Sequence, residues 1–201
     1  RCLHRPDRRC VLFPSIGASA FGGPSGLALS GYDYYNGALL RKSQGELPAV
    51  RTQEHHIPGD NGRAAQEEVG LRGAGAAAFA VEPDAAIAVD VTDTGDLPEM
   101  KSAMAVELGK GPAVKVMDRS VICTPAVVDA LEQAAKDCGV SAQREILLCG
   151  GTDTSALQKA RASVQAGAVS IPTRYIHSPS EMCAVSDVEQ SAALLAKFAV
   201  L

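Results

Sequence analysis

From residue 64 onward, short apolar runs alternate with helix-like segments, and this alternation limits the possible fold more than any other feature. The apolar runs are of the kind found in buried strands and lie at 85–91, 112–118, 144–149 and 168–172. Helix-like segments lie around and between them, at 71–81, 124–139, 152–167 and 186–200. Alternation at this spacing predicts a three-layer αβα sandwich, with a largely parallel, mixed sheet between two layers of helices.

The helix expected at 124–139 carries the clearest local signals. Thr124 stands at the cap position, Pro125 lies in the first turn and Gly139 closes the segment. Its apolar residues recur at the spacing of one helix face, and they are Val127, Val128, Leu131, Ala134, Ala135 and Cys138. The helix at 152–167 is expected to begin at its Thr/Asp pair, and the last helix is expected to use Ser186 or Asp187 as its cap.

The first 63 residues have a different character. They are rich in glycine and proline and show no sustained period of a strand or a helix. We therefore expect an irregular N-terminal part of low order at 1–63 and an α/β domain at 64–201. The chain opens with RCLHRPDRRC, which has neither a Met nor the apolar core of a signal peptide, and we interpret it as a piece of a longer protein.

Composition argues against several classes of function. A net charge of −4, 4% aromatic residues and no tryptophan argue against a nucleic-acid partner, which needs a basic or a stacking surface. No apolar run approaches the roughly 20 residues of a membrane span, so no membrane partner is expected. The six cysteines include no CxxC pair, which argues against a zinc knuckle or a thioredoxin-like site. Scattered cysteines are typical of reduced thiols in a cytoplasmic protein.

Polar residues cluster next to the expected strands, and the carboxyl ends of parallel strands are where ligands bind in α/β sheets. The candidates are the adjacent pair Glu67 and Glu68, then Asp90, Thr92 and Asp93, then Asp153, and finally Arg174, His177 and Glu181. One of two adjacent carboxylates can bind a metal while the other takes a proton from the activated water. A strand-end aspartate and a histidine add ligands that Zn²⁺ and Co²⁺ accept.

Each of these residues also has an ordinary structural explanation. Adjacent glutamates are usually a solvated surface pair. Asp90 at the end of an apolar strand can cap the next turn, and His177 can be a hydrogen-bonded loop histidine. The residues alone therefore leave open both a carboxylate–histidine metal hydrolase and a set of structural polar side chains.

Several sequence blocks, taken together and in order, resemble one known family. They are AAQEEVGLRGAGAAAF, AIAVDVT, LGKGPAVKVMDRS, GGTDTSALQ, SIPTRYIHSPSE and the closing DVEQSAALL helix. They are similar to the tetrahedral or glutamyl aminopeptidases, a family that also includes proteins labelled deblocking aminopeptidase and endoglucanase M. The resemblance covers 64–201 and implies a metallopeptidase that holds two divalent metal ions per subunit, Zn or Co. It also implies peptide substrates, which lose their N-terminal residues, and a homo-oligomer.

The resemblance further implies roles for individual residues. Glu67 corresponds to the general base that deprotonates the attacking water. Glu68 and His177 correspond to ligands of one metal, and Asp90 corresponds to a ligand of the other. Asp33, in GYDYYNGALL, corresponds to the aspartate that bridges the two metals, although Tyr35 replaces the arginine of the family pattern.

Two departures from the family lie upstream of the glutamate pair. The family has a further histidine ligand well before the bridging aspartate, with a small β-barrel domain inserted between them, and we expect both to be mostly missing here. The segment EHHIPGDNGR, at 54–63, stands where a buried strand should lead into Glu67. Its degenerate codons, shifted by one base, permit the strand-like Asn-Thr-Thr-Tyr-Leu-Val-Thr-Thr-Ala. We hypothesise a reading-frame error before residue 63, which an intact frame in the DNA would reject.

The leading interpretation is the catalytic α/β domain of a dinuclear metal-dependent aminopeptidase. The alternative is a catalytically inactive truncated homologue that acts only as a folding or assembly module. The missing upstream histidine separates the two, because one metal then lacks a ligand, and we expect weak metal binding and poor peptide hydrolysis from this chain. Glycan hydrolysis ranks last, because it needs a paired-carboxylate cleft and Glu67 and Glu68 are adjacent in sequence.

Overall fold

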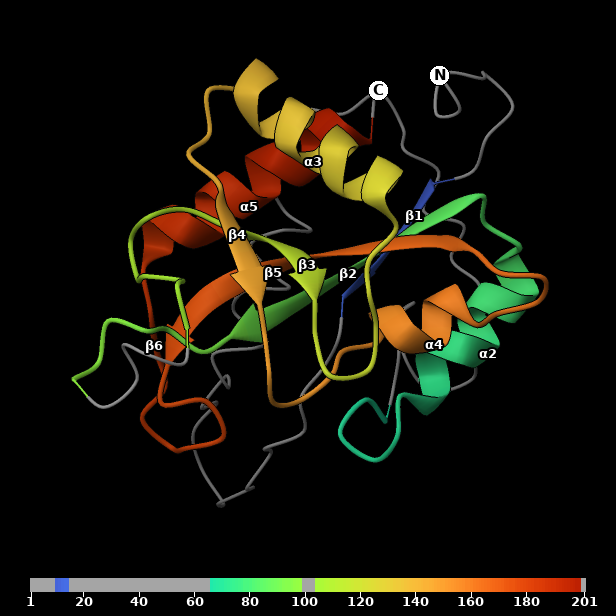
Figure 1. Ribbon diagram of the computed structural model, residues 1–201, viewed down its shortest axis with the longest axis horizontal. Helices are drawn as coiled ribbons and strands as arrows, with labels where there is room; N and C mark the ends of the chain where they lie inside the picture. The colour runs from blue at the N-terminus through green and yellow to red at the C-terminus, as the bar shows by residue number, and fades with distance from the viewer. Residues whose placement is uncertain (1–9, 15–65, 99–103, 200–201) are drawn as a thin grey trace, which may run out of the picture.

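The computed structural model describes residues 10–14, 66–98 and 104–199, and a twisted β-sheet forms its centre (Figure 1). The strands are β1 (Cys10–Pro14), β2 (Ala85–Thr92), β3 (Ala113–Met117), β4 (Gln143–Ile146), β5 (Gln165–Arg174) and β6 (Met182–Cys183). Their order is β1-β2-β5-β3-β4, and β6 pairs with the carboxyl end of β5.

Strand direction divides this sheet into two groups. β1, β2 and β5 are parallel to one another. β3 and β4 are parallel to each other, but β3 is antiparallel to β5, as is β6. The prediction of a mixed, largely parallel sheet is confirmed. However, the carboxyl ends of β3 and β4 point opposite to those of β2 and β5, so polar residues that follow the strands do not all share one edge.

Helices cover both faces of the sheet. α3 (Pro125–Asp137) and α5 (Val185–Phe198) pack on one face, and α2 (Arg72–Val81) and α4 (Thr154–Gln158) pack on the other (Figure 1). This arrangement confirms the three-layer αβα sandwich. In the part of the chain that the structure describes, no helix is long and apolar enough to cross a membrane.

The two faces are packed with side chains of different size. Large apolar side chains fill the layer under α3 and α5, and they include Ile87, Val89, Val127, Leu131, Val169, Leu194 and Phe198. The layer under α2 and α4 is built mostly of alanines: Ala74, Ala78, Ala86, Ala88, Ala160, Ala166 and Ala168. Small side chains let these helices lie close to the sheet. On the opposite face Gly167 does the same for α3, because a Cβ there would lie 2.6 Å from Val127 Cγ1.

The segment 152–167 differs from the long helix that we predicted. α4 covers only Thr154–Gln158, and β5 begins at Gln165, earlier than the predicted strand at 168–172. Arg161 and Ser163 have φ values of 51° and 91°, which a helix cannot contain. The chain therefore turns sharply between α4 and β5, and the residues that follow extend the buried strand.

Other element ends also differ from the sequence predictions. β1 lies within the part predicted to be irregular, where its residues pair in parallel with β2. Thr124 does precede α3, but its hydroxyl accepts the N–H of Ala166 on β5 and does not cap the helix. α5 begins earlier than predicted and has Ala184 as its cap residue, which places Asp187 in the first turn. The predicted boundary at residue 63 lies outside the described residues.

Candidate active site

One face of the sheet changes from apolar to polar along β2. Ala86 and Ala88 pack under α2 and α4, and Asp90 and Thr92 continue the same side of the strand, because side chains alternate with a period of two. The polar stretch continues on the neighbouring strands with Ser170, Lys115 and Glu145, all buried. The candidate site therefore lies on a face of the sheet beyond the two short helices.

Glu67 and Glu68 lie in the tight turn that leads into α2. The backbone N–H groups of Gly70 and Leu71 donate to the carbonyl oxygen of Glu67 over 3.1 and 3.0 Å. Gly70 has a φ of 111° and Leu71 has a φ of 56°, so the turn depends on left-handed backbone conformations. The turn fixes the backbone from which both carboxylates project.

Glu67 lies among other carboxylates. Burial, followed by the negative charge of Asp90 and then those of Asp153, Glu68 and Asp118, raises the pKa of Glu67 from 4.5 to about 8. Without a cation nearby, the side chain therefore holds a proton at neutral pH. A divalent cation among these carboxylates would offset their repulsion and lower the pKa of Glu67 again.

The structure brings Glu68 and His177 together from distant parts of the chain. His177 Nδ1 lies 3.6 Å from Glu68 Oε1, and the two side chains are 69% and 36% exposed, so solvent reaches both. The His177 backbone N–H donates to Glu181 Oε1 over 2.8 Å, while His177 itself has a φ of 62°. A left-handed conformation at a residue other than glycine costs about 1 to 3 kcal/mol and is typical of functional loops.

Asp90 lies within β2 and not after it, because the strand continues to Thr92. Asp90 as a residue is 9% exposed, and its Oδ1 accepts the backbone N–H of Val91 over 2.8 Å. Asp93 is the next polar residue along the chain. Its pKa is raised, chiefly by burial, and the nearby His177 offsets part of this rise.

Arg174 holds the loop after β2 against the end of β5. Its Nε and one terminal nitrogen donate to the two oxygens of Asp96 over 3.1 and 2.6 Å. These hydrogen bonds from Arg174 are the largest cause that lowers the pKa of Asp96 to about 2. Arg174 was predicted from the sequence but Asp96 was not, because an aspartate in a turn after a strand carries no distinctive signal.

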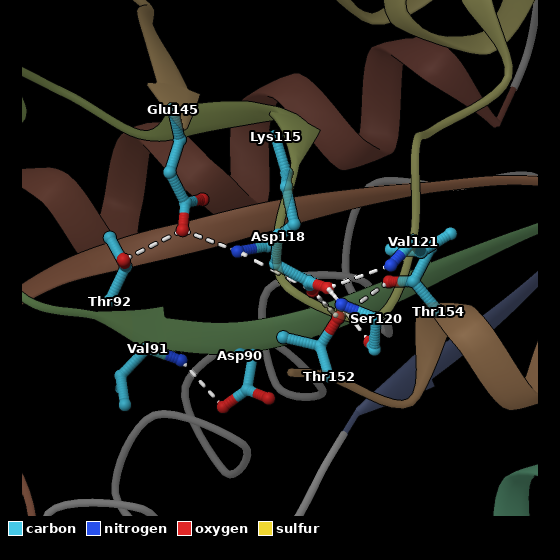
Figure 2. Close-up of polar contacts among 10 residues, drawn as sticks. All are labelled: Asp90, Val91, Thr92, Lys115, Asp118, Ser120, Val121, Glu145, Thr152 and Thr154. Atoms are coloured by element: carbon cyan, nitrogen blue, oxygen red, sulfur yellow. Dashed lines mark hydrogen bonds and ion pairs between the residues drawn. The ribbon is translucent and has the colours of Figure 1, made fainter. Parts of the chain in front are cut away.

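Asp118 connects two loops beside the site (Figure 2). Its Oδ1 accepts the backbone N–H and the hydroxyl of Ser120, both over 2.7 Å, and the N–H of Val121 over 3.0 Å. Its Oδ2 accepts the hydroxyl of Thr152 over 3.1 Å. Sequence analysis counted Asp118 as the end of an apolar strand, and its place directly after that run was the only available signal.

A fully buried ion pair, Lys115 with Glu145, also escaped the sequence analysis. Lys115 lies in the apolar run AVKVM, and Glu145 lies in REILL. A charged residue within each apolar run was the signal, since such residues are rarely buried without a partner.

Glu68 and His177 fit a divalent cation in kind and in spacing. Two ligands of a tetrahedral zinc ion lie about 3.4 Å apart, close to the 3.6 Å that separates their nearest nitrogen and oxygen. Asp90 adds a carboxylate beside Glu67. Among the described residues no three His, Cys, Asp or Glu side chains are already grouped as a metal site. Asp33, predicted to bridge the metals, lies outside the described residues.

Comparisons with known proteins cover most of this region. A model of the M42 glutamyl aminopeptidase family matches residues 48–194. An aminopeptidase homologue from Acetivibrio thermocellus is 52% identical over 130 residues, which cover 65% of this chain and 39% of the relative. The lysyl aminopeptidase of Pyrococcus furiosus is 39% identical over 127 residues, which cover 63% of this chain and 36% of the relative.

Solved structures show a similar fold over the same share of the chain. An aminopeptidase from the archaeon Desulfurococcus kamchatkensis has a TM-score of 0.66 at 38% identity, covering 68% of this chain and 39% of its own. The TET1 peptidase of Pyrococcus horikoshii has a TM-score of 0.59 at 31% identity. The match covers 68% of this chain and 39% of the TET1 chain. This chain thus spans about two fifths of the length of these relatives.

Proposed function

The chain belongs to the M42 glutamyl aminopeptidase family, and from this premise we propose that it is the catalytic α/β part of a metal-dependent aminopeptidase that releases N-terminal residues from peptides. The observation that carries the proposal is the placement of Glu68 beside His177, with Glu67 in the same turn among further carboxylates. A solvated glutamate pair on the surface does not require a contact with His177, whose backbone adopts a left-handed conformation.

The residues divide into ligands and a proton carrier. Glu68 and His177 would hold one divalent cation, Asp90 the other, and Asp33 would bridge the two. A Zn²⁺ or Co²⁺ ion held by these residues would supply Lewis acidity toward the scissile carbonyl and the attacking water.

Glu67 is proposed as the general base. One of its carboxylate oxygens accepts a proton from the attacking water, and the same oxygen then donates this proton to the nitrogen of the leaving amine. Partial burial keeps the Glu67 carboxylate from being fully solvated, which makes it a better proton acceptor than a surface glutamate.

Two further properties are proposed, an assembly of several copies and a location in the cell. The TET1 peptidase of Pyrococcus horikoshii assembles into a tetrahedron or a large octahedral shell, which supports a homo-oligomer for this protein. A cytoplasmic location is proposed from the sequence, because six scattered cysteines without a CxxC pair are typical of reduced thiols.

The test is release of N-terminal residues from short peptides, measured by mass spectrometry with added Co²⁺ and again after chelation. We expect slow, Co²⁺-dependent release that falls by about 10² to 10⁴ in Glu67→Gln. Release that survives chelation, or that Glu67→Gln leaves unchanged, would contradict the proposal. No release at all from a Co²⁺-loaded chain would favour the inactive folding module.

A further inference from the structure

We propose that the buried ion pair Lys115–Glu145 is a positioning unit, which holds Asp90 in place through the hydroxyl of Thr92. The inference rests on the proposed function, because it concerns the role of Asp90 as a metal ligand. None of these three supporting residues touches the substrate in the proposed reaction.

Three strands contribute to the unit (Figure 2). Lys115 from β3 and Glu145 from β4 are both 0% exposed, and the ammonium group of Lys115 contacts Glu145 Oε1. The same Oε1 accepts the hydroxyl of Thr92, from β2, over 2.7 Å. Lys115 Nζ also lies 4.0 Å from Asp118 Oδ2, so the ammonium group faces both carboxylates.

Stability alone does not account for this pair. Removing two charges from water costs several kcal/mol for each ion, and apolar residues of similar size are often neutral or more stable in such places. Glu145 Oε2 is buried and has no hydrogen-bond partner among the described residues, so the carboxylate is not even fully satisfied. A role in fixing a geometry accounts for a buried pair of this kind.

The geometry that it fixes is the carboxyl end of β2. Thr92 lies opposite Pro172 of β5, which has no N–H to donate, and the N–H of Val91 donates to the side chain of Asp90. The bond from Thr92 to Glu145 adds a side-chain tie between β2 and β4 where β2 ends, two residues from Asp90.

The test compares Thr92→Val, which keeps the shape and loses the hydroxyl, with Thr92→Ser, which restores it. Thr173→Val is the matched control, because Thr173 is also a buried threonine, but its hydroxyl donates to the Ile171 carbonyl over 3.1 Å within β5. Two quantities are measured: hydrogen exchange of residues 89–93 in the chelated protein, and Co²⁺ affinity by calorimetry.

We expect Thr92→Val to speed exchange at 89–93 and to weaken Co²⁺ binding by about 10- to 100-fold, as supporting residues of metal ligands do. Thr92→Ser and Thr173→Val should match the wild type in both measurements. The idea is wrong if Thr92→Val changes neither quantity, or if Thr173→Val changes both as much.

A double variant separates positioning from stability. Lys115→Met with Glu145→Leu should keep the unfolding midpoint near that of the wild type while Co²⁺ affinity falls as in Thr92→Val. A lower midpoint with unchanged affinity would assign the pair to stability and overturn the proposal.

Asp90→Asn distinguishes failure of this inference from failure of the proposed function. If Asp90→Asn leaves Co²⁺ binding unchanged, Asp90 is not a ligand and that part of the proposed function fails. Hydrogen exchange of residues 89–93 in the Thr92 variants then still shows whether Thr92 holds the end of β2.

Discussion

At the scale of single residues, two adjacent glutamates have different surroundings. Glu67 is partly buried among Asp90, Asp153 and Asp118, whereas Glu68 lies against the exposed ring of His177. The difference matters because environment sets the chemistry of a carboxyl group. A carboxylate with a raised pKa is a stronger proton acceptor once it is ionised, and a carboxylate that faces an imidazole suits binding of a cation.

The pKa of Glu67 predicts a pH dependence of stability in the chelated protein. Its folded-state value, about 8, lies above its ordinary value of 4.5. The folded state therefore holds a proton that the unfolded chain releases, and stability falls as pH rises from about 4.5 to 8. Thermal unfolding between pH 5 and 9 should show a shallower decline for Glu67→Gln than for the wild type.

The control for this measurement is Glu189→Gln, which changes an exposed glutamate on α5. It should reproduce the wild-type decline. An identical decline in the wild type and Glu67→Gln would contradict the elevated pKa.

Asp96 should show the opposite pH dependence. Its folded-state pKa of about 2 lies below its ordinary value of 3.8, so the Arg174 hydrogen bonds stabilise the fold above about pH 4, and this stability is lost as pH falls toward 2. Asp96→Asn should cost about 1 to 2 kcal/mol at pH 7 in urea unfolding, and less at pH 3. A cost that is equal at both pH values would show that the charge of Asp96 is not responsible.

Glu132→Gln is a matched comparison for Asp96→Asn. Glu132 also accepts two hydrogen bonds from an arginine, Arg144, and Glu132→Gln disrupts them. The side chain of Arg144, however, is 68% exposed. Exposed pairs contribute little, so the loss should be smaller than for Asp96→Asn.

At the scale of elements, the sequence predicted best where one local pattern decides the structure. α3 has a cap position, an early proline and a continuous apolar stripe, and all five of its buried residues had been predicted. α4 was predicted too long, because the local pattern at 159–167, with its three alanines, does not separate a helix from a strand. Pairing of β5 with β2 and β3 makes residues 165–167 part of a strand, and such pairing cannot be read from a local pattern.

The loop 109–111 connects the first turn of α5 to the start of β3 and leaves no room for a side chain at Gly111. Asp187, in the first turn of α5, accepts the N–H groups of Gly109 and Gly111 over 2.7 and 3.0 Å. Gly111 has a φ of +92°, and a Cβ there would lie 1.8 Å from the carbonyl oxygen of Ser141. Gly111→Ala should therefore cost about 2 to 4 kcal/mol in urea unfolding.

Gly109→Ala is the control for this loop. Gly109 has a φ of +78°, but a Cβ there would have nothing within 4 Å. It should cost about 1 kcal/mol, from backbone strain alone. Equal costs for the two variants would mean that the close contact with Ser141 is relieved cheaply.

At the scale of the whole molecule, the candidate site was predictable in part. Glu67, Glu68 and His177 were named from motifs, and the chain does bring Glu68 and His177 together. Lys115, Asp118 and Glu145 were missed. Their contacts with one another and with Thr92 depend on β3 and β4 running antiparallel to β5, and a local sequence pattern does not specify strand direction. Asp33 stays a prediction, because it lies outside the described residues.

We propose that Glu68 and His177 bind a metal while Glu67 moves a proton. Calorimetric titration with Co²⁺ of the wild type, Glu67→Gln, Glu68→Gln and His177→Ala tests it most directly. We predict that the wild type and Glu67→Gln bind Co²⁺ with similar affinity. Glu68→Gln and His177→Ala should lose more than the roughly 10- to 100-fold that loss of a supporting residue causes. Loss of binding in Glu67→Gln with binding retained in Glu68→Gln would contradict the assignment and exchange the two roles, and a wild type that binds no Co²⁺ would reject the site.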